Sequence, residues 1–384
     1  MNPLIATNKS PEEAVSNHAH ELVGIEVLRF LCAFAILVWH YQHFFFVGAV
    51  ENALVLRSTF PFYRLLRFAY EDGFWAVKIF WVISGFIFYW RYARPILNRQ
   101  VGLLEFAARR FSRLYPLHVL TLLLVAFMQY LYFRSHGQNF IYQNNSAGAF
   151  VGQIFFASNW FSWQTYTFNG PIWSISVEIL IYFAFYSIIR VFGGTPMVAI
   201  AAGALAFVLF KSDLLHWVLD KQVFECAILF FAGGLAQWLS NQRMALTLSI
   251  SVLAALGALL ALHVVYLQPS VVTILSVSLV LSFALSGELK AGVLFKRAAF
   301  LGNATYSSYL LHFPIQLAAV TVADAAGYSR DIFLGPTVMV SYLLLVVVLS
   351  LAVYHLFELP AQKWVRGRAI RLRRTLPRQG SAVP

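Results

Sequence analysis

Ten apolar segments, most of them close to twenty residues long, dominate the pattern of hydrophobic and polar positions along this chain. A helical segment of that length crosses the roughly 30 Å hydrocarbon core of a bilayer. The pattern therefore predicts an all-α, polytopic integral membrane bundle of about ten transmembrane helices. The segments are 23–45, 73–92, 114–133, 172–190, 195–211, 223–240, 246–266, 270–287, 301–323 and 335–357. A further apolar segment, 147–163, is expected to re-enter the membrane or lie at its surface.

Polar stretches flank the apolar region at both ends. We expect residues 1–20 to be a disordered tail, residues 21–360 to form the transmembrane domain, and residues 361–384 to form a basic tail suited to the anionic cytoplasmic leaflet. The first apolar segment follows about twenty polar residues and is long enough to span, so it is expected to target and anchor the chain.

The distribution of basic residues predicts the orientation of the bundle. With ten spans and a cytoplasmic amino terminus, 19 of the 28 lysines and arginines fall on the inner side and 7 on the outer side. Inner loops of membrane proteins carry the excess of positive charge, so both termini are predicted to lie in the cytoplasm.

Composition agrees with this membrane assignment. Hydrophobic residues make up 60% of the 384 residues and charged residues 11%, whereas soluble domains carry about 25% charged residues. The net charge of +12 follows from topology and contact with the lipid bilayer, without a nucleic-acid partner. Cys32 and Cys226 lie in apolar surroundings and are expected to be small buried residues. The sequence contains no HExxH, CxxC or phosphate-loop motif, and we predict no metal site.

Arg29 and His40 are the most informative polar residues because both lie inside the first apolar segment. Eleven positions are almost three helical turns, so the two side chains project from one face, roughly 17 Å apart along the axis. A buried arginine costs at least about 2.5 kcal/mol on insertion scales and usually faces a protein interior or a substrate path. The pair therefore predicts a polar path through the bundle.

Glu178 is a second ionisable residue inside a predicted span. Its helix enters from the outer side near residue 172, so Glu178 and His40 are expected at similar depth and could meet if the first and fourth spans pack together. A histidine oriented by a carboxylate is a workable general base. The alternative is a helix-packing glutamate, and His43 is expected to be a wetted residue at the interface.

Arg110 and Arg113 lie in an arginine-rich inner loop before the third span. If 103–113 is helical, their spacing puts both guanidinium groups on one face, a geometry suited to phosphates. The positive-inside bias alone also produces such loops. Further polar residues in or beside spans are candidates for a substrate path, although hydroxyls also bind helices together. They are Ser84, Trp173, Ser174, Tyr306 and His312.

Six motifs in order resemble the membrane-bound acyltransferase 3 family from Gly24 to about Trp364. They are LRFLCAFAILVWHY, FWVISGFIF, RRFSRLYP, PIWSISVEILIYF, LGNATYSSYLLHFPI and FELPAQKW. The resemblance implies a ten-helix bundle that uses a cytoplasmic acyl-coenzyme A, most often acetyl-CoA, as a donor substrate and holds no permanent cofactor. It assigns donor binding to Arg110 and Arg113, and catalysis to Arg29, His40 and Glu178.

The same resemblance implies an O-acyltransferase of the bacterial cytoplasmic (inner) membrane. The acceptor would be a hydroxyl of a carbohydrate such as lipopolysaccharide or an exopolysaccharide, with His40 as general base or transient acyl carrier. The chain resembles the stand-alone form, which completes the transfer itself or passes the acyl group to a separate periplasmic or extracellular partner. A different class remains open from the residues alone, a transporter or exporter of a polar lipid or saccharide that uses the same buried charges.

Overall fold

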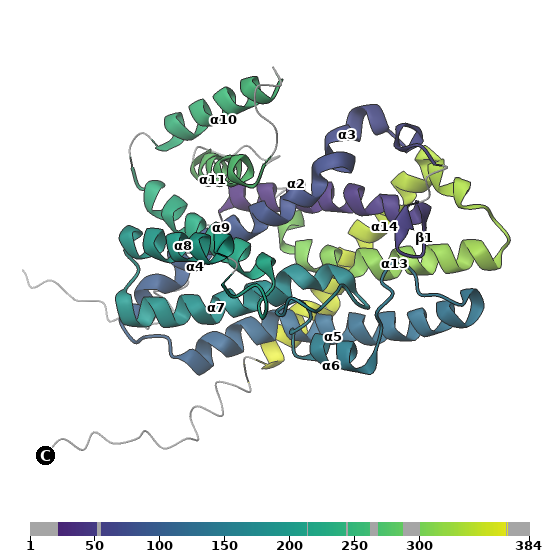
Figure 1. The fold of residues 1–384 in the computed structure, drawn as a ribbon, viewed down its shortest axis with the longest axis horizontal. Helices are drawn as coiled ribbons and strands as arrows, with labels where there is room; N and C mark the ends of the chain where they lie inside the picture. The colour runs from purple at the N-terminus through teal and green to yellow at the C-terminus, as the bar shows by residue number, and fades with distance from the viewer. Residues whose placement is uncertain are drawn as a thin grey trace, which may run out of the picture.

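The computed structural model describes residues 22–51, 55–212, 214–242, 245–261, 268–286, 300–365 and 367. In this part of the chain nearly all regular structure is helical (Figure 1), as predicted. The predicted tail 1–20 and most of 361–384 lie outside the described residues.

The first half of the fold contains five α-helices, several single turns and one short hairpin. In chain order these are α2 (Val23–Tyr41), η1 (Gln42–Phe45), β1 (Phe46–Val47), β2 (Val50–Glu51), η2 (Arg57–Thr59), α3 (Tyr63–Asp72), η3 (Gly73–Trp75), α4 (Ala76–Leu97), α5 (Leu103–His136) and α6 (Ala147–Ile154). The hairpin is antiparallel, with Phe46 opposite Glu51 and Val47 opposite Val50.

The second half continues as a series of helices. They are η4 (Gly170–Ile172), α7 (Trp173–Phe192), α8 (Pro196–Lys211), α9 (Lys221–Leu239), α10 (Ala245–Ala261), α11 (Pro269–Ser286), α13 (Thr305–Ala325), η5 (Arg330–Leu334), α14 (Pro336–Val353) and η6 (Tyr354–Glu358). Each of the ten predicted segments therefore coincides with a helix, although the ends differ.

Helix α5 begins well before the predicted span, because the arginine-rich loop continues as helix from Leu103. Gly102 precedes its first turn, and Glu105 in that turn lies 2.7 Å from the Arg109 guanidinium, an i,i+4 pair that supports a helix start. The predicted helical structure of 103–113 is confirmed, and the true loop between α4 and α5 is short.

Six helical stretches in the described part of the chain are long and apolar enough to cross a membrane. They are Val23–Phe45, Tyr63–Leu97, Leu103–His136, Gly170–Phe192, Lys221–Leu239 and Pro336–Val365. The protein is thus a multi-pass membrane protein, while the count of ten spans and the orientation of the termini stay predictions. Helix α6, in the segment 147–163, has 8 residues and rises only about 12 Å, too little to span.

Two glycines allow α4 and α9 to pack backbone against backbone. A Cβ atom at Gly85 would lie 1.8 Å from the carbonyl oxygen of Phe230, and one at Gly233 would lie 2.1 Å from that of Val82. Only glycine permits such an approach. Helix α4 also contacts α2 and α7, and α2 in turn contacts α13, so α2 and α4 lie among the helices that build the site.

Residues 137–172 connect α5 to α7 and fold partly into the bundle. Asn169 is fully buried and donates a hydrogen bond to the carbonyl of Leu310 in α13, 3.0 Å away. The hydroxyl of Ser176 accepts hydrogen bonds from the backbone N–H groups of Ser158 and Asn159. Helix α7 therefore begins inside the protein.

Candidate active site

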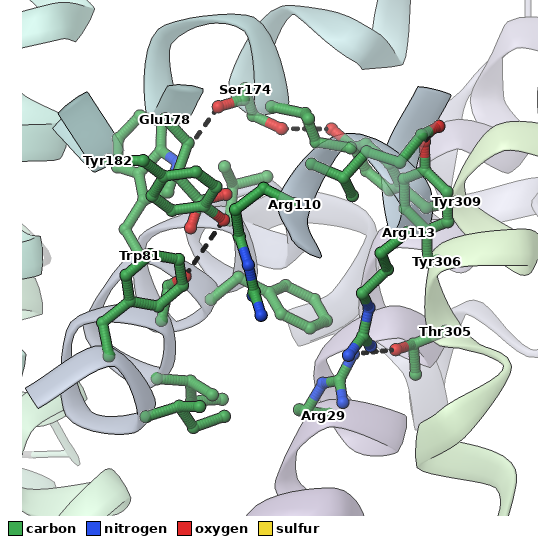
Figure 2. A pocket seen from close by; sticks show the side chains of 18 of the residues that line it. Arg29, Trp81, Arg110, Arg113, Ser174, Glu178, Tyr182, Thr305, Tyr306 and Tyr309 are labelled. Atoms are coloured by element: carbon green, nitrogen blue, oxygen red, sulfur yellow. Dashed lines mark hydrogen bonds between the residues drawn. The ribbon is translucent and has the colours of Figure 1, made fainter. Parts of the chain in front are cut away.

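A cavity of about 160 Å³ lies between helices α2, α4, α5, α7 and α13. Its walls are mainly apolar, with a concentrated set of polar side chains (Figure 2). These are Arg29, Ser84, Arg110, Arg113, Ser174, Glu178, Tyr182, Thr305, Tyr306 and Tyr309. Seven sequence-predicted candidates, from five distant segments, therefore line one pocket, which we call the central pocket.

Arg29 is held in a fixed orientation in the central pocket. Its guanidinium group donates to both carboxylate oxygens of Glu26, at 3.0 and 2.9 Å, and to the Thr305 hydroxyl at 3.0 Å. Glu26 lies one turn earlier on α2, a spacing that favours such a pair. The helix and its neighbour α13 thus supply the partners that make a largely buried arginine tolerable.

Arg110 and Arg113 project from one face of α5, as their spacing predicted. Arg110 donates to the Tyr92 hydroxyl at 2.5 Å, and its guanidinium carbon lies 5.0 Å from the ring centres of both Phe88 and Tyr92. Figure 2 shows Arg110 pointing into the pocket, with Trp81 and Arg29 on opposite sides. Arg113 makes no hydrogen bond to any described residue, so its donors are available to an anion.

Glu178 is the carboxylate of the central pocket. It hydrogen-bonds with Ser84 and Tyr182, whose hydroxyl oxygens lie 3.3 Å apart, and the positive charges of Arg110 and Arg29 act on it. Its partners come from α4 and from the next turn of α7. The carboxylate therefore faces the arginines across the pocket.

The far end of the central pocket is closed by aromatic residues. The Ser174 and Tyr309 hydroxyls are 2.8 Å apart, and the Trp81 indole N–H donates to the Ser174 carbonyl at 3.4 Å. Trp173 lies behind this wall, with its ring edge to face against Trp81 at 5.7 Å. Trp173 is thus a supporting residue and does not line the pocket.

His40 belongs to a separate buried histidine cluster, formed with His43 and His312. The ring centre of His40 is 4.6 Å from that of His312 and 5.0 Å from that of His43. The Nδ1 atom of His40 lies 2.9 Å from the Ile36 carbonyl, and that of His312 lies 3.2 Å from the Ser308 carbonyl. Each Nδ1 therefore donates, and each Nε2 is left as the basic nitrogen.

The expectation that His43 is a wetted interfacial residue is wrong. His43 is 5% exposed, because η1 continues inward after α2 and buries all four of its side chains. His43 thus belongs to the interior and packs against His40.

His40 and Glu178 do not meet, in contrast to their expected contact. Along α13, Thr305 meets Arg29, Tyr309 meets Ser174, and His312 meets His40. Glu178 lies one turn beyond Ser174 in the direction of Arg29, about 6 Å farther from His40. The depth estimate failed because α7 begins inside the bundle, where Asn169 holds its start against Leu310.

Tyr309 connects the two sites. Its hydroxyl binds Ser174 in the central pocket, and its ring centre lies 5.9 Å from that of His312. A continuous series of polar side chains thus runs from the arginines, past Glu178 and Tyr309, to His312 and His40.

A comparison with known protein families identifies the family to which this chain belongs. The family model described as an acyltransferase domain, Acyl_transf_3, matches residues 22–355, which include every helix of the site. The chain belongs to the acyltransferase 3 family. An acyltransferase domain thus covers most of the chain, and family membership favours a transferase over the exporter that the residues alone left open.

One curated relative is also named as an acyltransferase. The chain is 27% identical over 176 residues to acyltransferase MdmB of Streptomyces mycarofaciens, a match that covers 44% of this chain and 40% of the relative. The matched part thus spans less than half of that relative's length. No solved structure matches the chain.

Four residues of the central pocket with hydrogen-bonding side chains were not predicted from the sequence: Trp81, Tyr182, Thr305 and Tyr309. Helical spacing could have found Tyr182, which follows Glu178 by one turn, and Tyr309, which precedes His312 by three residues. Trp81 and Thr305 carried no such signal. Among the described residues, no group of three or more His, Cys, Asp or Glu side chains is placed to hold a metal ion.

Proposed function

We propose that the protein transfers an acetyl group from cytoplasmic acetyl-CoA to a hydroxyl group of a carbohydrate, such as a lipopolysaccharide or another surface glycan. The continuous series from Arg110 and Arg113 to His40 carries this proposal. It offers an anion-binding end, a closed pocket for a thioester and a basic imidazole beyond it.

The arginine end of the central pocket is the proposed donor end. Coenzyme A carries phosphates, and arginine binds them with its fork of N–H donors. Arg113 has its donors available, whereas Arg110 is stacked on aromatic rings and presents a positioned charge. The thioester would then extend into the pocket past Glu178.

His40 is the proposed general base. Its Nδ1–H is directed at the Ile36 carbonyl, which leaves Nε2 to take the proton of the acceptor hydroxyl. The acceptor oxygen attacks the thioester carbonyl carbon, the carbon–sulfur bond breaks, and coenzyme A leaves as a thiolate that takes up a proton. His312, between Tyr309 and His40, lies where the acceptor and the acyl group would meet.

Glu178 has a different proposed role from the one expected. Because it is remote from His40, it cannot orient that imidazole. With Ser84 and Tyr182 it lies at the donor end, where the thiolate departs and requires a proton. Arg29 would stabilise the negative charge that develops there.

His40→Ala is the first test of this function. The purified protein in lipid nanodiscs is incubated with acetyl-CoA labelled in the acetyl group and a mixture of glycans. We expect the wild type to label a glycan and His40→Ala to lose at least about 100-fold in rate, the scale of a missing general base.

The matched control is His355→Ala, which removes an exposed histidine that lines neither the central pocket nor the histidine cluster. Wild-type rates in His40→Ala would contradict the assignment of the base. Movement of a saccharide without label would instead favour an exporter. Labelled glycan formed by this chain alone would show that it needs no separate acyl-handling partner.

The proposed setting is the bacterial inner membrane. Acetyl-CoA is a cytoplasmic metabolite and the acceptor is displayed outside, so donor and acceptor would approach from opposite faces. The basic residues near the donor end agree with a cytoplasmic position for it.

A further inference from the structure

The central pocket has an order along its length, which two helices define in parallel. On α4 the order is Phe88, Ser84 and Trp81, and on α7 it is Tyr182, Glu178 and Ser174. Phe88 stacks on Tyr182 at 4.2 Å, and Trp81 binds Ser174. Arg110 lies at the Phe88 end. The pocket therefore runs from a cationic entrance to a wall formed by Trp81.

Trp81 is a rigid part of that wall. Its side chain is 1% exposed, its indole N–H is bound to Ser174, and Trp173 supports its ring. The Lys78 ammonium lies 4.9 Å from the Trp81 ring centre and forms an ion pair with Glu225 of α9. Because these contacts fix the indole from several sides, a ligand cannot displace it cheaply.

The space in front of Trp81 is small. A cavity of about 150 Å³ holds one benzene molecule, and the whole central pocket is about 160 Å³. The thioester group itself takes part of that volume. Only an acyl group of a few carbons then fits between the thioester and the indole.

We propose that Trp81 sets the upper limit on the acyl chain, so that the donors of this enzyme are short-chain acyl-CoA thioesters. This inference rests on the proposed function, because it assumes that the acyl group enters the central pocket from the arginine end. With the thioester near Glu178 and Ser174, the methyl end of the acyl group meets Trp81. Longer chains are rejected by steric overlap with the Trp81 side chain, which its contacts hold in place.

The test compares kcat/KM for acetyl-CoA, butyryl-CoA and hexanoyl-CoA in the wild type, Trp81→Phe and Trp81→Ala. We expect the wild type to prefer acetyl-CoA over hexanoyl-CoA by at least about 100-fold. Trp81→Ala should change the hexanoyl to acetyl ratio by at least about tenfold in favour of hexanoyl, with Trp81→Phe between the two. The hexanoyl to acetyl ratio compares two kcat/KM values from the same enzyme sample. A smaller fraction of correctly folded enzyme therefore does not change it.

Trp90→Ala is the matched control, since Trp90 is on the same helix, 40% exposed and outside the pocket. Its ratio should equal that of the wild type. Transfer by the wild type with an unchanged ratio in both Trp81 variants would overturn this inference alone. A wild type that transfers no acyl group from any of the three donors would overturn the proposed function as well.

Discussion

Arg110 and Arg113 are three residues apart on one helical face, yet their side chains are held differently. Arg110 is stacked between aromatic rings and bound to Tyr92, so its charge is positioned but its donors are partly used. Arg113 lines the same pocket without a hydrogen-bond partner among the described residues. Positive-inside bias alone could have explained this arginine-rich segment. It nevertheless contains one arginine, Arg113, whose N–H donors are available to a ligand.

Arg113→Ala tests this distinction. Charge-assisted hydrogen bonds contribute about 1.5–3 kcal/mol, so we expect the KM for acetyl-CoA to rise at least about tenfold, with a smaller change in kcat. Arg109→Ala is the control, because Arg109 is paired with Glu105 and does not line the pocket. Equal donor affinity in the wild type and Arg113→Ala would show that Arg113 does not bind the donor. The positive-inside bias would then be a sufficient explanation for the arginine loop.

At the scale of elements, the glycine contact between α4 and α9 fixes the wall that carries Ser84 and Trp81. Gly85→Ala would place a methyl group within 1.8 Å of a backbone oxygen, where no rotamer change can relieve the clash. Overpacking typically costs about 1–3 kcal/mol, and a backbone clash can cost more. We expect a clearly lower Tm, measured by the thermal unfolding of protein in detergent.

Gly257→Ala is the control for Gly85→Ala. Gly257 also lies within an apolar helix, α10, but nothing lies within 4 Å of a Cβ atom added there. It should unfold at or slightly above the wild-type temperature, since alanine favours helix. Equal Tm values for the two variants would show that the α4 and α9 backbones are not in close contact.

The elements and the depth of their residues were not equally predictable from the sequence. Apolar length and helical spacing identified ten helical segments and the shared face of Arg110 and Arg113, whereas the more polar helix α3 was missed. The position of Glu178 was wrong because it depends on residues 137–172, an irregular segment held inside by contacts such as that of Asn169 with Leu310. Such contacts between distant residues leave no periodic pattern, and the burial of His43 was missed for the same reason.

At the scale of the whole molecule, the bundle has two distinguishable ends. Arg330 binds Asp324 and Tyr132 at the end where α5 and α13 finish, and Asp324 also contacts His136. The start of α5 and its arginines lie at the other end. Which end faces the cytoplasm stays a prediction from the charge distribution, which places the arginine end there.

Cysteine labelling in intact cells tests that orientation. Tyr328→Cys, at an exposed position of the His136 end, should react with a membrane-impermeant maleimide. Gln100→Cys, exposed between α4 and α5, should react only after the cells are opened. The native Cys32 and Cys226 are buried and should give little background. If only Gln100→Cys were labelled in intact cells, the predicted topology would be wrong and the opposite orientation would hold.

The hydrogen bond between Ser174 and Tyr309 has a consequence for the energy supply of the cell. Many cell membranes store a proton gradient, which an open, continuous file of water molecules would discharge. The two bonded hydroxyls, flanked by the rings of Trp81 and His312, fill the space between the central pocket and the histidine cluster. In the proposed reaction, donor and acceptor would meet across this contact, so the protein would need no open water-filled pore to bring them together.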